Sequence, residues 1–248
     1  GGEHRDRAWA SPDAVLAHRQ QAEPLERELR RLDEEIAGLR SKALPAARAA
    51  RGAIEKKLLP PPDSRLTEEA FAPTVVRFVR FTITRCVSGT KAPAGHRILA
   101  PGGAPILDEV ELWTAKANVA KGAKVTADST KTGFIVDALV DGKSDRAWSG
   151  TKGNQGRLTF ELPRPEKLTR IAWSNDRVGQ MQSLFQNGVP ADYVFEGSLD
   201  GVKWFRLAGS ERRIPILEED RETLALVTVM SAGERARWQH WQAERTAL

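Results

Sequence analysis

The sequence predicts a mainly β protein with helices at both ends: an antiparallel β-sandwich plus a helical hairpin or coiled coil formed by the N- and C-terminal segments. Three observations predict it. Apolar residues recur at heptad spacing within residues 25–43, short segments between residues 74 and 229 have strand patterns, and a helix-start signal precedes a tryptophan-containing C-terminal stretch. We therefore expect a helical region over 1–62, a sandwich over 74–229 and a C-terminal helix over 231–248.

The N-terminal region shows an apolar seam typical of a coiled coil. Pro24 suits the first turn of its helix, Pro45 is expected to interrupt it, and a second helix over residues 46–59 should end at the three prolines 60–62. The seam residues, separated alternately by four and three positions, are Leu25, Leu29, Leu32, Ile36, Leu39 and Ala43.

The C-terminal segment is expected to cover this seam. Ser231 and Glu234 form a capping-box pattern at the start of a helix. Trp238 and Trp241 then lie three residues apart on one helix face, which would be a poor surface if exposed. We expect this helix to pack antiparallel along the Leu25–Leu39 seam, which brings the two ends of the chain together.

The middle of the chain consists of short strand-like segments with turn residues between them. Asp200-Gly201 predicts a hairpin turn, and residues 223–229 read as a last strand. Trp173 and Trp204 are taken as strand residues and are expected in the core. The other strand-like segments are residues 76–83, 107–113, 158–162, 168–173 and 193–198.

Composition argues against several classes of protein. The single cysteine excludes a disulfide framework within the chain, and no apolar run is long enough for a membrane helix. No nucleophile, zinc-protease or phosphate-binding motif is present, so we do not expect an enzyme. The net charge of +5 comes from 38 basic and 33 acidic residues. Nucleic acid is not the expected partner, although residues 46–57 are basic enough to leave a polyanion contact open.

Four blocks of the middle region resemble a known family. Residues 138–149 (ALVDGKSDRAWS) are similar to the Asp-Gly and Trp-Ser signature of discoidin domains, also called coagulation factor 5/8 type C domains, which overlap with family 32 carbohydrate-binding modules. Residues 118–127, 157–162 and 193–204 resemble three further blocks of that family, in the family's order. The resemblance implies a jelly-roll β-sandwich with Trp148 in its core. The alternative is that Trp148 forms a platform for a sugar ring.

The order of two other strands departs from the family. Residues 77–83 and 107–113 resemble strands that normally close a discoidin domain, yet they come first here, so the domain looks circularly permuted. This order, flanked by coiled-coil segments, resembles an insertion in large secreted cytochrome-c-type proteins of planctomycetes, and it implies an extracellular or periplasmic location. Their haem-binding motif is absent, because Cys86 stands alone.

The resemblance also implies a structural calcium ion near the Asp-Gly turn. Asp141, Asp145 and Glu109, with Glu111 as an alternative to Glu109, are the carboxylates available to it. Lys143 stands where the family usually has a second acid. The alternative is that Asp141 only shapes the turn. No other cofactor is expected.

The candidate ligand-binding residues lie in the long polar loop after residues 168–173. The residues selected are Asn175, Asp176, Arg177, Gln180 and Phe185, with His96 from a second loop. The alternative interpretation is a loop that its own side chains hold in place.

These observations predict a non-catalytic module that recognises a glycan, including an anionic polysaccharide, through the loop tips of the sandwich. The alternative is a structural spacer or docking domain that assembles with a protein partner through the coiled coil and binds no small ligand. No membrane association is expected.

Overall fold

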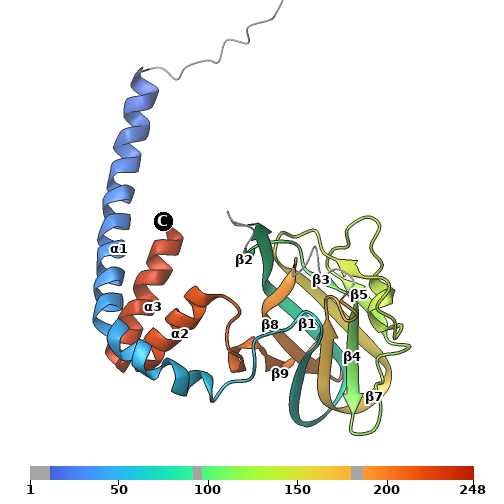
Figure 1. Ribbon diagram of the computed structural model, residues 1–248. Coiled ribbons are helices and arrows are strands. Elements are labelled where there is room, and N and C mark those ends of the chain that lie inside the picture. The colour runs from blue at the N-terminus through green and yellow to red at the C-terminus, as the bar shows by residue number, and fades with distance from the viewer. Residues whose placement is uncertain (1–11, 92–96, 180–186) are drawn as a thin grey trace, which may run out of the picture. The chain divides into compact units, whose positions relative to one another are not determined.

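The computed structural model describes residues 12–91, 97–179 and 187–248 (Figure 1). The chain divides into two compact units. One contains the chain up to Ile54 together with Glu222–Leu248, and the other is Glu55–Arg221. Within the described residues the fold is a mostly antiparallel β-sheet with three α-helices, which confirms the β-rich, helix-containing class that the sequence predicts.

The N-terminal helix α1 (Pro12–Glu55) is continuous over 44 residues. Pro24 and Pro45 both lie inside it, so the prediction that Pro24 occupies the first turn and that Pro45 separates two helices is wrong. An internal proline removes one helical hydrogen bond. The turns around Pro45 are stabilised by packing instead, because Leu39 before it and Ala47 after it are buried in the core of the helical unit.

The helix α2 (Glu218–Val229) replaces the strand that we predicted over residues 223–229. The run from Thr223 alternates in a way that suits a strand. However, Ala225 and Leu226 are buried together with Met230, a spacing that matches one helix face. Acidic residues fill the first turn of α2, where they complement the helix dipole.

The helix α3 (Ala232–Ala247) begins with the predicted capping box. The Ser231 hydroxyl accepts a hydrogen bond from the Glu234 N–H at 3.3 Å, and the Glu234 carboxylate accepts one from the Ser231 N–H at 3.0 Å. These bonds satisfy two backbone donors at the helix start. The capping-box prediction is confirmed.

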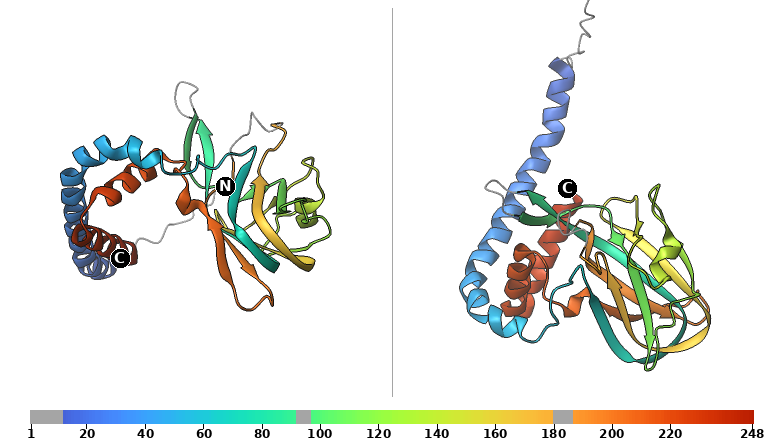
Figure 2. Two further views of the ribbon diagram at one scale, coloured as in Figure 1. Left: turned by 90° about the horizontal axis from the view of Figure 1, so that it is seen from below. Right: turned by 45° about the vertical axis from the view of Figure 1, so that its right-hand side comes forward.

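The helix α3 lies antiparallel to the C-terminal half of α1 (Figure 2). Arg245 near the end of α3 pairs with Asp33 at 2.6 Å, whereas Glu234 at its start pairs with Lys42 at 2.6 Å. Trp238, which lies between Glu234 and Arg245 in the sequence, is buried in the core of the helical unit. Leu25, at the start of the predicted seam, has 48% of its surface exposed.

The second unit is built on an antiparallel sheet. Its main sheet has seven strands within the described residues, in the order β4-β7-β1-β8-β9, with β2 paired to β1 and β5 paired to β7. A separate two-stranded sheet joins β3 and β6. The strands are β1 (Thr67–Lys91), β2 (Arg97–Pro101), β3 (Ile106–Leu107), β4 (Glu109–Thr114), β5 (Lys124–Ala127), β6 (Trp148–Ser149), β7 (Gly156–Ser174), β8 (Val189–Ser198) and β9 (Phe205–Gly209), with 3-10 turns at Val136–Val140 and Ser210–Arg212.

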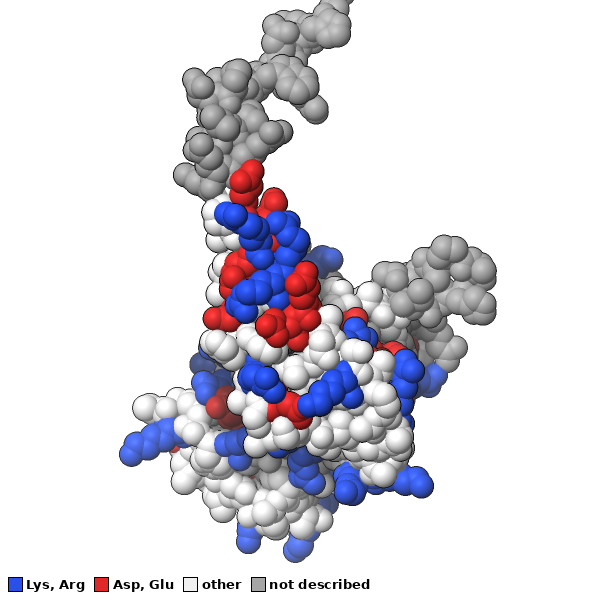
Figure 3. All heavy atoms as spheres, turned by 90° about the vertical axis from the view of Figure 1, so that its left-hand side faces the viewer, with Lys and Arg blue, Asp and Glu red and all other residues white. Residues whose placement is uncertain are grey.

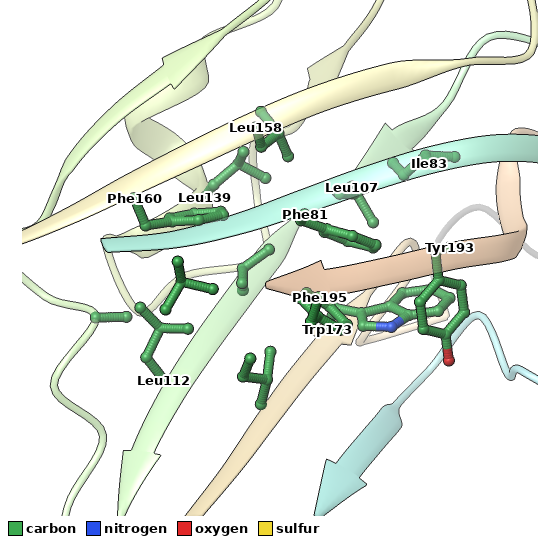
Figure 4. Close-up of a cluster of buried hydrophobic side chains, with 14 of the residues drawn as sticks. Phe81, Ile83, Leu107, Leu112, Leu139, Leu158, Phe160, Trp173, Tyr193 and Phe195 are labelled. Atoms are coloured by element: carbon green, nitrogen blue, oxygen red, sulfur yellow. The ribbon is translucent and has the colours of Figure 1, made fainter. Parts of the chain in front are cut away.

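The core of this unit lies against one face of the sheet (Figure 4). Alternate residues of β1, among them Phe81, are buried there. The rings of Phe81 and Phe195 stack with centroids 4.2 Å apart, and Tyr193 meets Trp173 edge-on at 5.5 Å. Trp148 and Trp173 are fully buried, as predicted. Trp204 is only half-buried and lies over Arg80, so its predicted place in the core is wrong.

A buried ionic cluster joins the segment before β1 to the segment after β9. Glu69 is fully buried and accepts hydrogen bonds from the Tyr193 hydroxyl at 2.6 Å and from Arg213 at 2.5 Å. Arg213 also donates to the Pro60 carbonyl at 2.9 Å. Burial, and then the neighbouring Glu69 charge, raise the pKa of Tyr193. The cluster fixes the two chain segments that enter and leave the sheet.

Candidate functional site

A hollow lies at the end of the sheet unit beside β3 and β6. Its volume is about 580 Å³. We call it the loop-end hollow. Its lining residues are Gly102, Gly103, Ala104, Lys131, Gly150, Thr151, Gly153 and Asn154. Three loops that are distant in the sequence contribute to it.

Glycines at its edge let these loops approach closely. Gly103 has a φ of +80°, and a Cβ atom there would lie 2.1 Å from the Ser88 hydroxyl oxygen. Gly188 has a φ of +70°, and its Cβ atom would lie 1.9 Å from the Ala104 carbonyl oxygen. A side chain at either position would therefore both strain the backbone and collide with a neighbouring loop. These glycines keep main-chain groups at the edge of the hollow.

Backbone hydrogen bonds hold the walls of the hollow together. The Gly150 N–H donates to the Pro105 carbonyl at 3.2 Å, and the Lys131 N–H donates to the Ser149 carbonyl at 2.8 Å. The side chains of Thr151 and Asn154, in contrast, form no hydrogen bond with other residues that the structure describes. The hollow thus combines a fixed frame with polar side chains that are available to a ligand.

Asn175, a predicted ligand-binding residue, is buried behind this frame. Its amide donates to the Ile106 carbonyl at 2.6 Å and to the Asn187 carbonyl at 3.3 Å. Asp176 is also buried, and its N–H donates to the Ser64 carbonyl at 2.9 Å. Asn175 therefore ties the start of β3 to the segment before β8. Three other predicted residues, Gln180, Phe185 and His96, lie outside the described residues.

Arg177, the predicted cationic contact, is anchored to the strand β4 and the residue before it. Its N–H donates to Asp108 at 2.6 Å, its Nε donates to the Ser174 hydroxyl at 3.1 Å, and its guanidinium pairs with Glu111 at 3.1 Å. Burial raises the pKa of Asp108, and its hydrogen bonds with Ser174 and Arg177 oppose that rise. These contacts fix the start of the loop to β4, to the residue before β4 and to the last residue of β7.

Glu109, a predicted calcium ligand, is a buried acid without a hydrogen bond. Its surface is 4% exposed, and within the described residues neither carboxylate oxygen has a hydrogen-bond partner. Burial, and then the negative charges of Asp141 and Glu111, raise its pKa to about 8. The nearby Gly142 N–H, which does not meet the geometry of a hydrogen bond to Glu109, and the Arg177 charge lower the pKa. A bound cation or a bound proton would stabilise this side chain.

The other two predicted calcium ligands fit a cation less well. One Asp141 oxygen accepts a hydrogen bond from the Lys143 N–H at 2.8 Å and the other accepts one from Arg146 at 2.7 Å, as in a turn-shaping aspartate. The Asp145 side chain is 69% exposed and lies 3.9 Å from Arg146. Within the described ranges, no group of three or more His, Cys, Asp or Glu residues is arranged to hold a metal ion. Of the three predicted ligands, Glu109 alone combines burial with carboxylate oxygens that have no hydrogen-bond partner in the described residues. The calcium site stays a prediction.

Sequence reasoning missed the side chains that line the hollow, namely Lys131, Thr151 and Asn154. The one available signal was the glycine-containing, polar stretch 150–156, which directly follows the Trp148-Ser149 pair. It is short, and nothing in the sequence shows that it meets residues 102–104.

Comparisons of the chain with models of protein families, with curated proteins and with solved structures gave no match in any of the three. None of the helices in the described residues is both long enough and apolar enough to cross a membrane.

Proposed function

We propose that this protein is a non-catalytic module that recognises a glycan in the loop-end hollow. The observation that carries the proposal is the lining: a hydroxyl, a carboxamide, an ammonium group and glycine main chain around one space of about 580 Å³. Sugar hydroxyls both donate and accept hydrogen bonds, and Thr151, Asn154 and peptide groups do the same. The ammonium of Lys131 would add affinity for an anionic polysaccharide.

The frame of the hollow supports the proposal because hydrogen bonds within the protein hold it without a ligand's help. A preorganised site loses less conformational entropy on binding than a flexible one. In this account Asn175 and Arg177 act by positioning the loops, and they do not touch the ligand. Their loss would weaken binding indirectly, through movement of the segments around Ile106 and Asp108.

We further propose that the sheet unit is a circularly permuted discoidin-like sandwich of an extracellular or periplasmic protein. Two features support this interpretation. β1 is the first strand in the sequence, yet it lies between β7 and β8 in the middle of the sheet. Trp148 of the signature block is buried, as that resemblance implies.

The test is calorimetric titration of the full chain with neutral, uronate-containing and sulfated oligosaccharides. We expect Lys131→Ala and Asn154→Ala, each alone, to weaken binding by about tenfold, equivalent to about 1.4 kcal/mol. Lys121→Ala is the matched control, because it removes an exposed lysine that does not line the hollow. Unchanged affinity in both hollow variants, or no binding by any oligosaccharide, would contradict the proposal.

A docking role for the helical unit is the second candidate function. α1 continues well beyond the end of α3, whose Arg245 already pairs with Asp33 (Figure 1). Leu25 is exposed on this extension. A coiled coil with a protein partner would cover it. Sedimentation of the full chain and of a Leu25→Glu variant tests this idea: a concentration-dependent assembly that the variant loses supports it, and a monomer at every concentration counts against self-association.

A further inference from the structure

A second hollow lies on the opposite side of the main sheet from its core. Its volume is about 240 Å³. We call it the sheet-face hollow. Its lining residues are Phe78, Lys124, Thr126, Thr159, Glu161, Gly201 and Trp204. None of them lines the loop-end hollow, so the two hollows are separate.

The strand register explains why these side chains share a face. Glu161 of β7 pairs with both Phe78 of β1 and Lys124 of β5, and Thr159 pairs with Thr126. Directly paired residues present their side chains on the same side of a sheet. Phe160, between Thr159 and Glu161, is fully buried in the core. The sheet-face residues therefore point away from the core.

The Trp204 ring is held in place at the edge of this hollow. Its Nε1 donates to the Gly201 carbonyl at 3.1 Å, and the Arg80 guanidinium lies 4.1 Å from the ring centroid. Arg80 is in turn fixed by Glu196 at 2.8 Å. Gly201 has a φ of +74°, and a Cβ atom there would contact the Phe78 ring at 3.6 Å. Two aromatic rings are thus positioned around one small space.

The polar groups beside these rings are available to a ligand. The hydroxyls of Thr126 and Thr159 form no hydrogen bond with the residues that the structure describes, and Lys124 forms no ion pair with them. Glu161, the acid of the hollow, is already paired with Arg77 at 2.9 Å. Because Arg80 is likewise paired with Glu196, Lys124 is the cation at this hollow that forms no ion pair with the described residues.

We infer that the sheet-face hollow is a second carbohydrate-binding site, which takes an acidic sugar unit. The C–H face of a pyranose ring is apolar and matches an aromatic ring, whereas its hydroxyls require partners such as Thr126 and Thr159. A carboxylate or sulfate group on the sugar would meet Lys124. This site goes beyond the proposed function, because it gives one chain two sugar contacts and hence higher avidity for a polymer.

The experiment is titration of the full chain with a neutral, a uronate-containing and a sulfated oligosaccharide, together with the NMR signal of the Trp204 indole N–H. We expect Trp204→Ala to weaken binding of the acidic sugar at this site about tenfold or more, and Trp204→Phe to retain most of it. Lys124→Gln should weaken binding of the acidic sugars and leave the neutral one unchanged. The uronate and sulfate arms show which anionic group is preferred.

Two controls separate this inference from the proposed function. Phe205→Ala removes an exposed aromatic residue that follows Trp204 but does not line the hollow, and Lys121→Gln removes a nearby lysine charge. Both should bind like the original chain, and so should Asn154→Ala at this site. If Trp204→Ala and Lys124→Gln change nothing while Asn154→Ala abolishes binding, the second site is wrong and the loop-end site stands. If no sugar binds, both are wrong.

Discussion

At the scale of single residues, the position of Glu109 shows how burial and nearby charge act together. Its carboxylate is almost inaccessible, has no hydrogen bond within the described residues, and lies near the charges of Asp141 and Glu111. The ionised form is therefore unfavourable in the folded protein. Asp141 avoids the same cost because Arg146 and the Lys143 N–H each stabilise one of its oxygens.

Stability should consequently fall as pH rises through the range between the two pKa values of Glu109. Its pKa is about 8 in the folded chain and 4.5 ordinarily, so the folded state holds the proton over an interval in which the unfolded state has lost it. Stability linked to this group is then fully present at or below about pH 4.5 and lost towards pH 8. Glu109→Gln should remove most of this dependence in urea unfolding at a series of pH values.

Glu26→Gln, which changes an exposed helix residue, is the matched control and should leave the pH dependence as it is. An equal slope in the original chain and in Glu109→Gln would contradict the assignment. Added calcium provides a second arm of the same measurement. If Glu109 binds calcium, the ion should raise the unfolding midpoint of the original chain near pH 8 but not that of Glu109→Gln.

At the scale of elements, the sequence correctly predicted the helices and strands whose residue pattern is compatible with only one type of secondary structure. The alternation in residues 76–83 matches β1, and Ser231 with Glu234 caps α3 as expected. Residues 223–229 form a helix because tertiary packing of Ala225 and Leu226 overrides a pattern that is ambiguous over so short a run. Pro45 is tolerated in α1 for a similar reason: packing on both sides outweighs the lost hydrogen bond.

The packing of α3 on α1 should depend on one tryptophan more than on the other. Trp238 is 8% exposed in the core of the helical unit, whereas Trp241 is half-buried at its edge. We expect Trp238→Ala to destabilise the helical unit by about 3–5 kcal/mol, since it leaves a large cavity, and Trp241→Ala to cost clearly less. Thermal unfolding followed by far-UV circular dichroism measures both. Equal losses would show that the two helices are not packed around Trp238.

At the scale of the whole molecule, the placement of the charged side chains bears on whether the protein binds a polyanion, a question that the net charge of +5 leaves open. Basic and acidic side chains are interspersed on the exposed surface of α1, where Arg31 pairs with Glu28 at 2.6 Å and Arg30 lies near Glu26 (Figure 3). Such a mixed surface attracts a polyanion less than a basic stripe would. The unpaired cations that matter to the account, Lys131 and Lys124, line the two hollows instead.

The candidate site was only partly predictable from the sequence, and the reason is spatial. The sequence pointed to the loop after β7, and Asn175 does hold the segment around Ile106 beside the loop-end hollow. The lining residues Thr151 and Asn154 meet residues 102–104 only through the folded arrangement of three loops. The sheet-face hollow was missed because Trp204 was predicted in the core, whereas it lies just before β9 with the Arg80 guanidinium over its ring.

The most direct test of the central claim is an NMR titration of the isotope-labelled full chain with the oligosaccharide that binds best. The account predicts that amide signals of residues 102–104 and 150–154 shift together, along with the Asn154 side-chain amide, with one common Kd for this site. Signals of Asn175 and Arg177 should move less, because neither residue lines the hollow. Shifts that avoid residues 102–104 and 150–154, or an absence of shifts with every sugar class, would contradict glycan recognition in the loop-end hollow.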